Sequence, residues 1–183
     1  MRKLCILPLI FLCALGSADQ PTAKSLIDSA LAKATKENKS VMVMFDASWC
    51  GWCKRLDGYL AVPNVKAFME KEFVLVHIDV MEQPEKKNLE NPGGMDYMKS
   101  WNGADAGLPF TVLLDAKGKV IINSNMKEEG KSGNMGCPWA PEEQDFFFKM
   151  IQAARPKVAK AQLEMLRTEL GAFIAKTEKK GGG

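Results

Sequence analysis

Apolar residues along this chain follow two patterns, one with the spacing of a helix and one made of short continuous runs. In residues 22–38 apolar side chains recur at helical spacing with lysine and glutamate between them, which predicts an amphipathic helix. The continuous runs at 41–45 and 73–79 are typical of strands that are buried on both faces of a sheet. Because another helical pattern separates these strands, we expect a right-handed crossover and a parallel pair.

The second half of the chain predicts an antiparallel hairpin followed by helices. Apolar runs at 110–114 and 119–123 are joined by the tight turn Asp115-Ala-Lys-Gly118. Helical spacing returns at 141–154 and again at 157–176. Together these elements predict an α/β fold with a central mixed sheet of about four strands, helices on both faces and an extra C-terminal helix.

A chain of 183 residues that is 46% hydrophobic has enough apolar surface for one core, so one folded domain is expected. We divide the chain into a signal peptide at 1–18, a domain at 19–155 with a loop insertion at 124–140, a C-terminal helical extension at 156–178, and a disordered tail at 179–183.

The N-terminus has the features of a secretory signal peptide. Arg2 and Lys3 precede an almost wholly apolar run at 4–15, and Gly16-Ser17-Ala18 supplies the small residues that a signal peptidase reads. The run is short for a membrane-spanning helix. We therefore expect cleavage near Ala18 and export to the periplasm or the extracellular space, with membrane attachment only if the signal is retained.

The net charge of +3 is small, and lysine and arginine are interspersed with acidic residues rather than gathered into a stripe. Nucleic acid is therefore not an expected partner.

Removal of the signal leaves three cysteines, Cys50, Cys53 and Cys137. A secreted scaffold held together by disulfides would carry an even, dense set, so we expect a working dithiol and one odd thiol. Cys50 lies where a strand leads into a helix, a position that favours its thiolate, and Cys53 is one turn further on, close enough to form a disulfide with it. Zinc is the alternative, but it usually takes four ligands, and only Cys137 and His77 remain. No metal or organic cofactor is expected.

Two motifs resemble those of the thioredoxin superfamily and occur in the family's order within residues 24–154: Trp49-Cys-Gly-Trp-Cys53 after the first strand, and Gly107-Leu-Pro-Phe-Thr111 before the hairpin. The resemblance implies a three-layer sandwich in which Cys50 is the exposed nucleophile and Cys53 the resolving thiol. It also implies a cis peptide bond at Pro109.

The same resemblance implies a groove for an extended substrate peptide beside the cysteine pair. We expect Trp49, Gly51, Trp52, Leu108 and Pro109 to contact that peptide, with the two tryptophans supplying apolar surface.

The chain departs from the family in two ways. Thioredoxins carry a buried aspartate in the first strand, where this sequence has Met44; Asp46 follows on the same face of the strand. Asp46 either takes over the proton-accepting role or only caps the loop. The second departure is the dipeptide Gly51-Trp52, which has no histidine and so favours a reductant-like potential over an oxidant. His77, in the second strand, is expected to be a core or rim residue.

The sequence therefore predicts an exported thiol–disulfide oxidoreductase that acts on cysteines of other exported proteins and depends on a redox partner for regeneration. The alternative is a redox-inactive or regulatory module that binds peptides in the groove at Pro109. Cys137 is interpreted first as an inert thiol; a link to another chain and a second redox thiol stay open.

Overall fold

The computed structural model describes residues 20–126 and 133–181. The expected signal peptide lies outside these residues, as do 127–132 of the insertion and 182–183 of the tail. The elements are α1 (Ala23–Glu37), β1 (Ser40–Asp46), α2 (Gly51–Leu60), α3 (Pro63–Glu72), β2 (Phe73–Asp79), the 3-10 helix η1 (Pro84–Leu89), α4 (Gly94–Ser100), β3 (Phe110–Leu114), β4 (Val120–Asn123), α5 (Pro141–Ala154) and α6 (Lys160–Gly181).

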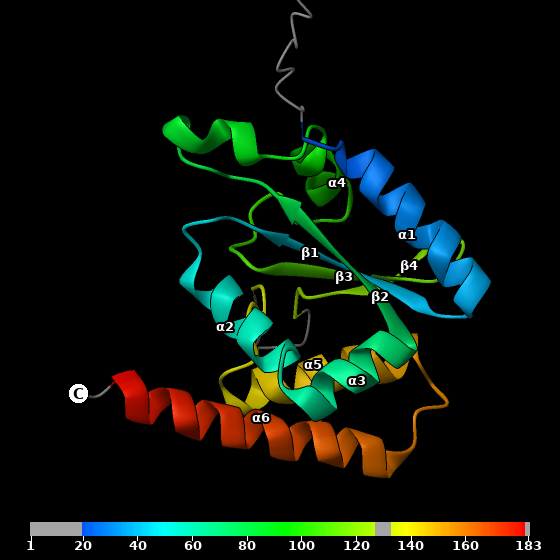
Figure 1. Cartoon of the computed structure of the whole chain (residues 1–183), viewed down its shortest axis with the longest axis vertical. Helices are drawn as coiled ribbons and strands as arrows, with labels where there is room; N and C mark the ends of the chain where they lie inside the picture. The colour runs from blue at the N-terminus through cyan, green and yellow to red at the C-terminus, as the bar shows by residue number, and fades with distance from the viewer. Residues whose placement is uncertain (1–19, 127–132, 182–183) are drawn as a thin grey trace, which may run out of the picture.

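The four strands form one mixed sheet in the order β2-β1-β3-β4 (Figure 1). β1 pairs in parallel with β2, and it pairs antiparallel with β3, which in turn forms the predicted hairpin with β4. The mixed sheet predicted from the sequence is therefore confirmed. Because β1 and β2 are parallel, the loops that follow them leave the sheet at the same edge.

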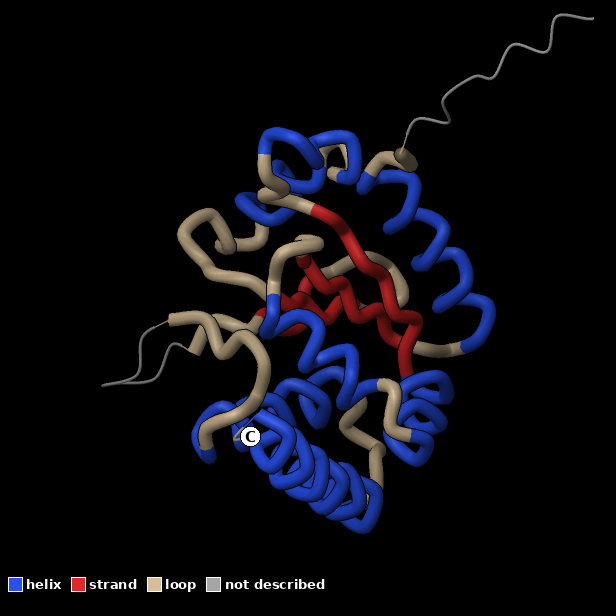
Figure 2. Tube along the Cα trace, turned by 60° about the vertical axis from the view of Figure 1, so that its left-hand side comes forward, coloured by secondary structure: helices blue, strands red, loops and turns tan. Residues whose placement is uncertain are grey.

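Helices cover both faces of the sheet, as expected (Figures 1 and 2). Along β1, Val41, Val43 and Phe45 belong to the core that α1 and α4 cover. Met42 and Met44 point the other way, into the core shared with α2, α3, α5 and α6. This alternation is the two-residue period of a strand, and both sets are buried because the sheet lies between two helical layers.

Local sequence signals set the helix boundaries. The Thr22 hydroxyl accepts a hydrogen bond of 3.1 Å from the backbone N–H of Ser25 at the start of α1. Asn38 ends α1 in the left-handed region, with φ of 55°. Pro63 begins α3 because its missing N–H is not needed in a first helical turn, and it separates α3 from α2.

The C-terminal helix packs on the domain and extends further than expected. Leu166 and Leu170 of α6 are buried against α2, α3 and α5, and Leu163 and Phe173 lie partly buried beside them. The helix continues to Gly181, so the expectation of a disordered tail from residue 179 is wrong for residues 179–181. Residues 172–180 contain no proline or glycine, and most of them favour helix, so local propensity continues the helix to Gly181. Among the described helices, none has the length and apolar character to cross a membrane.

Candidate active site

The cysteine pair lies where β1 leads into α2. Cys50 is the N-cap residue of α2 and forms a disulfide with Cys53, with 5.3 Å between their Cα atoms. The sulfur of Cys50 also accepts a hydrogen bond of 3.0 Å from the backbone N–H of Cys53. The first sulfur is thus held at a helix N-terminus, where unpaired N–H groups and the helix dipole favour a thiolate once the disulfide is reduced.

Both cysteines are buried in the disulfide, with exposed fractions of 3% for Cys50 and 4% for Cys53. The expectation of an exposed Cys50 is therefore wrong for the oxidised form. Leu108, from the loop before β3, packs against both cysteines, and the sulfur of Cys50 is directed at the backbone of α2.

Two exposed tryptophans flank the disulfide. Trp49 and Trp52 are 49% and 45% exposed, which places apolar surface next to the reactive sulfurs. The indole N–H of Trp49 donates to the backbone carbonyl of Met81, at 2.8 Å. Gly51, between Cys50 and Trp52, is also exposed. These three expected substrate contacts are therefore exposed beside the disulfide.

The insertion contributes an aromatic residue that the sequence analysis missed. The ring of Trp139 lies 5.6 Å from that of Trp52, edge to face, and the Arg55 guanidinium lies 4.3 Å from the Trp52 ring centroid and 5.0 Å from that of Trp139. The contact between the tryptophans joins residues 87 positions apart, from α2 to the approach to α5. These aromatic and cation–π contacts fix the Trp52 ring beside the disulfide.

The Leu108–Pro109 peptide bond is cis, and a side chain from the insertion holds its loop. The Asn134 amide donates to the backbone carbonyls of Gly107 and Pro109, at 2.6 and 2.8 Å. Ser124 in turn donates its hydroxyl proton to the Asn134 side-chain oxygen and accepts a hydrogen bond from the backbone N–H of Thr111. The sequence pattern gives no sign of this role, because it depends on which loops meet in space.

Cys137 is a buried free thiol in the core beneath α2 and α5. Burial raises the pKa of its thiol to about 12, and the nearby carboxylate of Glu143 adds to the shift. The thiol therefore stays protonated at neutral pH, which favours the interpretation of Cys137 as an inert thiol.

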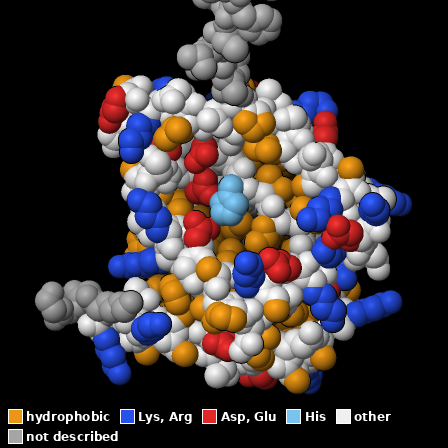
Figure 3. Space-filling model, viewed as in Figure 1, with side chains coloured by type: hydrophobic (Ala, Val, Ile, Leu, Met, Phe, Trp, Pro, Cys, Tyr) orange, Lys and Arg blue, Asp and Glu red, His pale blue; other side chains and the backbone are white. Residues whose placement is uncertain are grey.

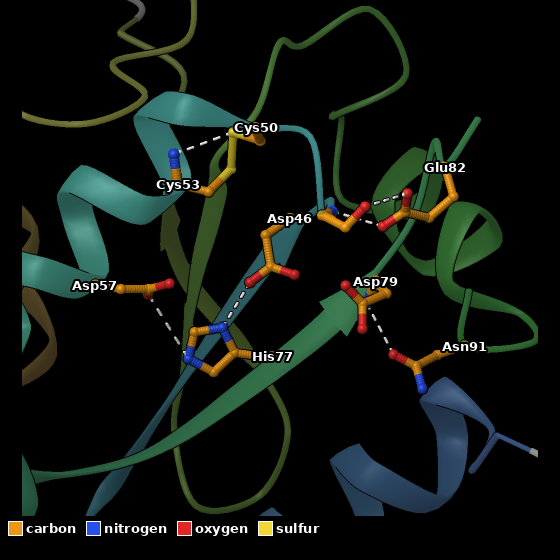
Figure 4. A network of polar contacts seen from close by, with 9 residues as sticks. Asp46, Cys50, Cys53, Asp57, His77, Asp79, Glu82 and Asn91 are labelled. Atoms are coloured by element: carbon orange, nitrogen blue, oxygen red, sulfur yellow. Dashed lines mark hydrogen bonds and ion pairs between the residues drawn. A yellow bond between two sulfur atoms is a disulfide. The ribbon is translucent and has the colours of Figure 1, made fainter. Parts of the chain in front are cut away.

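Asp46, Asp57, His77 and Asp79 form an acidic cluster around the single histidine, below the disulfide (Figure 4). Met44, at the position of the family's buried aspartate, is an apolar core residue that is 1% exposed. Asp46 lies between the disulfide and His77 in Figure 4, and its Oδ2 is 2.5 Å from the Nδ1 of His77. The carboxylate of Asp46 is therefore paired with an imidazole.

The cluster changes the protonation of its members. The hydrogen bond to Asp46, with the charges of the surrounding aspartates, raises the pKa of His77 although burial opposes the shift. Burial raises the pKa of Asp79 to about 6, and the charge of Asp46 adds to the rise. Burial also raises the pKa of Asp57. His77 therefore lies at the rim, as expected, within a cluster of carboxylates that raises its pKa.

Glu82, in the loop after β2, is a buried carboxylate that fixes the segment before Cys50. It is 3% exposed, and its two carboxylate oxygens accept hydrogen bonds from the backbone N–H and the hydroxyl of Ser48, at 2.5 and 2.9 Å. Motif reasoning missed this residue. The only available signal was the parallel pairing of β1 and β2, which brings the loops after them together.

Replacing Glu82 with glutamine is expected to lower the free energy of unfolding by about 1 to 2 kcal/mol, because a charge-assisted pair of hydrogen bonds becomes one neutral bond. Urea unfolding of the oxidised protein measures this. The exposed glutamate of η1, Glu85, supplies the control Glu85→Gln, which should have no comparable effect. Equal unfolding midpoints for all three proteins would contradict this role of Glu82.

Among residues 20–126 and 133–181, no group of three or more histidine, cysteine, aspartate or glutamate side chains is arranged to hold a metal ion.

Comparison with known proteins finds similarity to thioredoxin-like and thiol:disulfide interchange proteins. A family model described as thioredoxin-like matches residues 22–116. The thiol:disulfide interchange protein DsbD of Vibrio cholerae is 30% identical over 102 residues, which are 56% of this chain and 16% of that protein. The chain therefore spans less than a fifth of the length of this curated relative.

Two solved structures illustrate the similarity. A disulphide isomerase from Xylella fastidiosa is 26% identical, with a TM-score of 0.47 and coverage of 63% of this chain and 80% of that one. The oxidised C-terminal domain of DsbD from Neisseria meningitidis is 21% identical, with a TM-score of 0.45 and coverage of 74% and 99%.

Proposed function

This chain belongs to the thioredoxin-like family, and on that premise we propose that it is an exported oxidoreductase that exchanges disulfides with cysteines of other exported proteins. The observation that carries the proposal is the disulfide between Cys50 and Cys53, which caps the N-terminus of α2 beside the cis peptide bond at Pro109. A disulfide between cysteines three positions apart at a helix N-terminus is suited to reversible reduction, because the helix stabilises the thiolate that forms.

In the reducing direction, the thiolate of Cys50 attacks one sulfur of a substrate disulfide, and the other substrate sulfur leaves as a thiolate. Cys53 then attacks the sulfur of Cys50, which forms the bond between Cys50 and Cys53 and releases the second substrate thiolate. Two electrons pass from the dithiol to the substrate, and two protons reach the substrate sulfurs. The dithiol carries both electrons, so no organic cofactor is needed.

Substrate contacts are assigned to the exposed surface around the pair. Trp49 and Trp52 offer apolar area, Gly51 leaves room above the first turn of α2, and Leu108, which is half-buried, borders the pair. The Pro109 side chain is buried, so a contact with substrate at this position would be made by its backbone. An extended peptide that bears the target cysteine suits this surface, because it can place a sulfur beside Leu108 without a deep pocket.

A reductant-like potential and export complete the proposal. The segment Gly51-Trp52 has no histidine that could stabilise the Cys50 thiolate. Because a stabilised thiolate raises the reduction potential, its absence favours a reductant-like potential. Export is supported by the signal-like pattern of residues 1–18, and the name of the Vibrio cholerae relative supports thiol:disulfide interchange. A redox partner would have to return electrons to the pair after each turnover.

The reduced protein is expected to accelerate the reduction of insulin by dithiothreitol. The reduction potential of the Cys50–Cys53 pair should lie closer to about −270 mV than to about −120 mV. Insulin turbidity and equilibration in defined thiol buffers measure the two quantities. A potential near the upper value would overturn the reductant-like assignment. No acceleration, together with intact peptide binding, would instead favour the alternative of a redox-inactive peptide-binding module.

A further inference from the structure

We propose that Arg55, held by the rings of Trp52 and Trp139, forms a subsite that binds an acidic side chain of the substrate peptide, close to the reactive cysteine of that peptide. The inference rests on the proposed function and names a feature of its substrates. It concerns a part of the rim that the insertion helps to build, because Trp139 contacts both Trp52 and Arg55.

Aromatic rings, and not an ion pair, fix the guanidinium of Arg55. Its Cζ lies 4.3 Å from the ring centroid of Trp52 and 5.0 Å from that of Trp139. Within residues 20–126 and 133–181, no carboxylate forms an ion pair with Arg55 and no oxygen accepts a hydrogen bond from its guanidinium. A cation–π contact does not occupy the N–H donors of the guanidinium, so its planar fork is available to the two oxygens of a carboxylate.

Two carboxylates share the surroundings of the Cys137 thiol with Arg55, and both face other groups. Asp57 faces the histidine of the acidic cluster. Oε2 of Glu143 accepts hydrogen bonds of 3.0 and 2.8 Å from the two backbone N–H groups just before α5. A carboxylate from another molecule can therefore pair with Arg55 without displacing either of them.

The backbone around Trp139 holds its ring at a fixed place on the rim. Its N–H donates to Oε2 of Glu143 at 3.0 Å, and its carbonyl accepts a hydrogen bond of 2.8 Å from the side-chain amide of Gln144. The half-buried ring meets that of Trp52 edge to face, with 70° between the ring planes. Because both rings are held in this way, Arg55 loses little conformational freedom when it binds a carboxylate.

The subsite lies within reach of a residue two positions from the target cysteine. Arg55 follows Cys50 by five residues, which is about 7.5 Å along the axis of α2. Its contact with Trp52 shows that the side chain points back toward the start of the helix. Along an extended peptide, a residue two positions from the cysteine lies about 7 Å from it. An acidic residue at that position can therefore meet Arg55 while the cysteine faces the disulfide.

The distribution of charge favours the Arg55 side of the disulfide for an acidic residue. Asp46, Asp57 and Asp79 gather around His77, and their charges repel a carboxylate. In Figure 3 the acidic side chains around the histidine lie in the hollow of the face, and basic side chains lie along its left margin. An acidic substrate residue is therefore repelled by the cluster and attracted by Arg55.

Model peptides that differ only in charge test the subsite. The substrates are acetyl-Glu-Ala-Cys-Ala-Glu-amide and the peptides in which glutamine or lysine replaces both glutamates, each activated as a mixed disulfide with 2-nitro-5-thiobenzoate. The Cys50 thiolate of the reduced protein attacks the peptide sulfur, and the coloured thiobenzoate thiolate leaves with the electron pair of the broken bond. Its release gives the rate constant, which is divided by that of the same peptide with uncharged 2-mercaptoethanol to correct for intrinsic reactivity.

The corrected rate constant should be about fivefold higher for the glutamate peptide than for the glutamine peptide, and lowest for the lysine peptide. Arg55→Gln should bring the ratio of glutamate to glutamine peptide close to unity, because the guanidinium is gone. Arg55→Lys should also lose most of the preference, since an ammonium lacks the planar fork. Trp139→Leu should lower the ratio, because it removes one of the two rings that hold Arg55 and keeps an apolar side chain.

Lys54→Gln is the matched control, because Lys54 is an exposed cation that precedes Arg55 in α2, and this variant should keep the preference. The readout is a ratio between peptides on one protein, so a general loss of reactivity does not change it. Equal corrected rates for the three peptides, a preference that survives Arg55→Gln, or one that Lys54→Gln removes would overturn the inference and leave the exchange activity standing. If no peptide reacts, the proposed exchange activity fails, and the inference fails with it.

Discussion

Replacing Cys50 with serine is expected to abolish disulfide exchange, whereas replacing Cys53 with serine should leave a protein that captures substrates and fails to release them. Cys50 caps α2, where a thiolate is stabilised, so the first attack depends on this sulfur. Cys53 lies one turn inside the helix and is the sulfur that breaks the mixed disulfide. The two variants therefore fail at different steps, although each removes one sulfur.

Insulin reduction and mass spectrometry under non-reducing conditions distinguish these outcomes. The Cys53→Ser protein should accumulate mixed disulfides at Cys50, and the Cys50→Ser protein should not. The double variant Cys53→Ser/Cys137→Ser is the control and should accumulate the same mixed disulfides, because the burial and raised pKa of Cys137 keep its thiol out of the reaction. Loss of the mixed disulfides in the double variant would mean that Cys137, and not Cys50, captures the substrate, and it would contradict the proposed roles.

Replacing Leu166 with alanine is expected to lower the free energy of unfolding by about 3 kcal/mol. Leu166 is fully buried between α6 and the core beneath the sheet, so its truncation removes apolar burial and leaves a cavity. The residue also marks the attachment of α6 to α2, because the hydroxyl of Tyr59 in α2 donates to the Leu166 carbonyl, at 2.9 Å. The extension therefore forms part of the cover of the core.

Urea denaturation of the oxidised protein measures the loss, and Leu163→Ala is the matched control. Leu163 is on the same helix and is only partly buried, so its truncation should cost about 1 kcal/mol or less. Equal losses for the two variants would mean that α6 contributes through its helical structure alone, and not through the burial of Leu166.

The sequence determined those features that depend on neighbours along the chain. Helical and strand spacing predicted the order of elements, and the apolar runs of β1 and β2 predicted a sheet with helices on both faces. The pair Cys50 and Cys53 could be placed at a strand-to-helix junction because both residues lie within one helical turn. Local propensity also explains why α6 continues through Lys179, although the expected helical extension ended at residue 178.

Tertiary structure alone decided how distant residues meet at the site. Glu82 reaches Ser48 across 34 positions, and His77 reaches Asp46 across 31. These side chains lie together because β1 and β2 pair in register and end at the same edge. The sequence could name Asp46 as a possible proton acceptor, but its imidazole partner depends on this register.

The insertion shows the same limit more strongly. Its composition gives no periodic signal, yet Asn134 holds the loop of Pro109 and Trp139 packs on Trp52. Leu108, distant in sequence, likewise packs against the small cluster of Ala47, Cys50 and Cys53. The physical reason is common to all these cases. A pattern along the chain reports which face of an element is apolar, whereas the partners of a polar or aromatic side chain depend on loops that only the folded chain brings together.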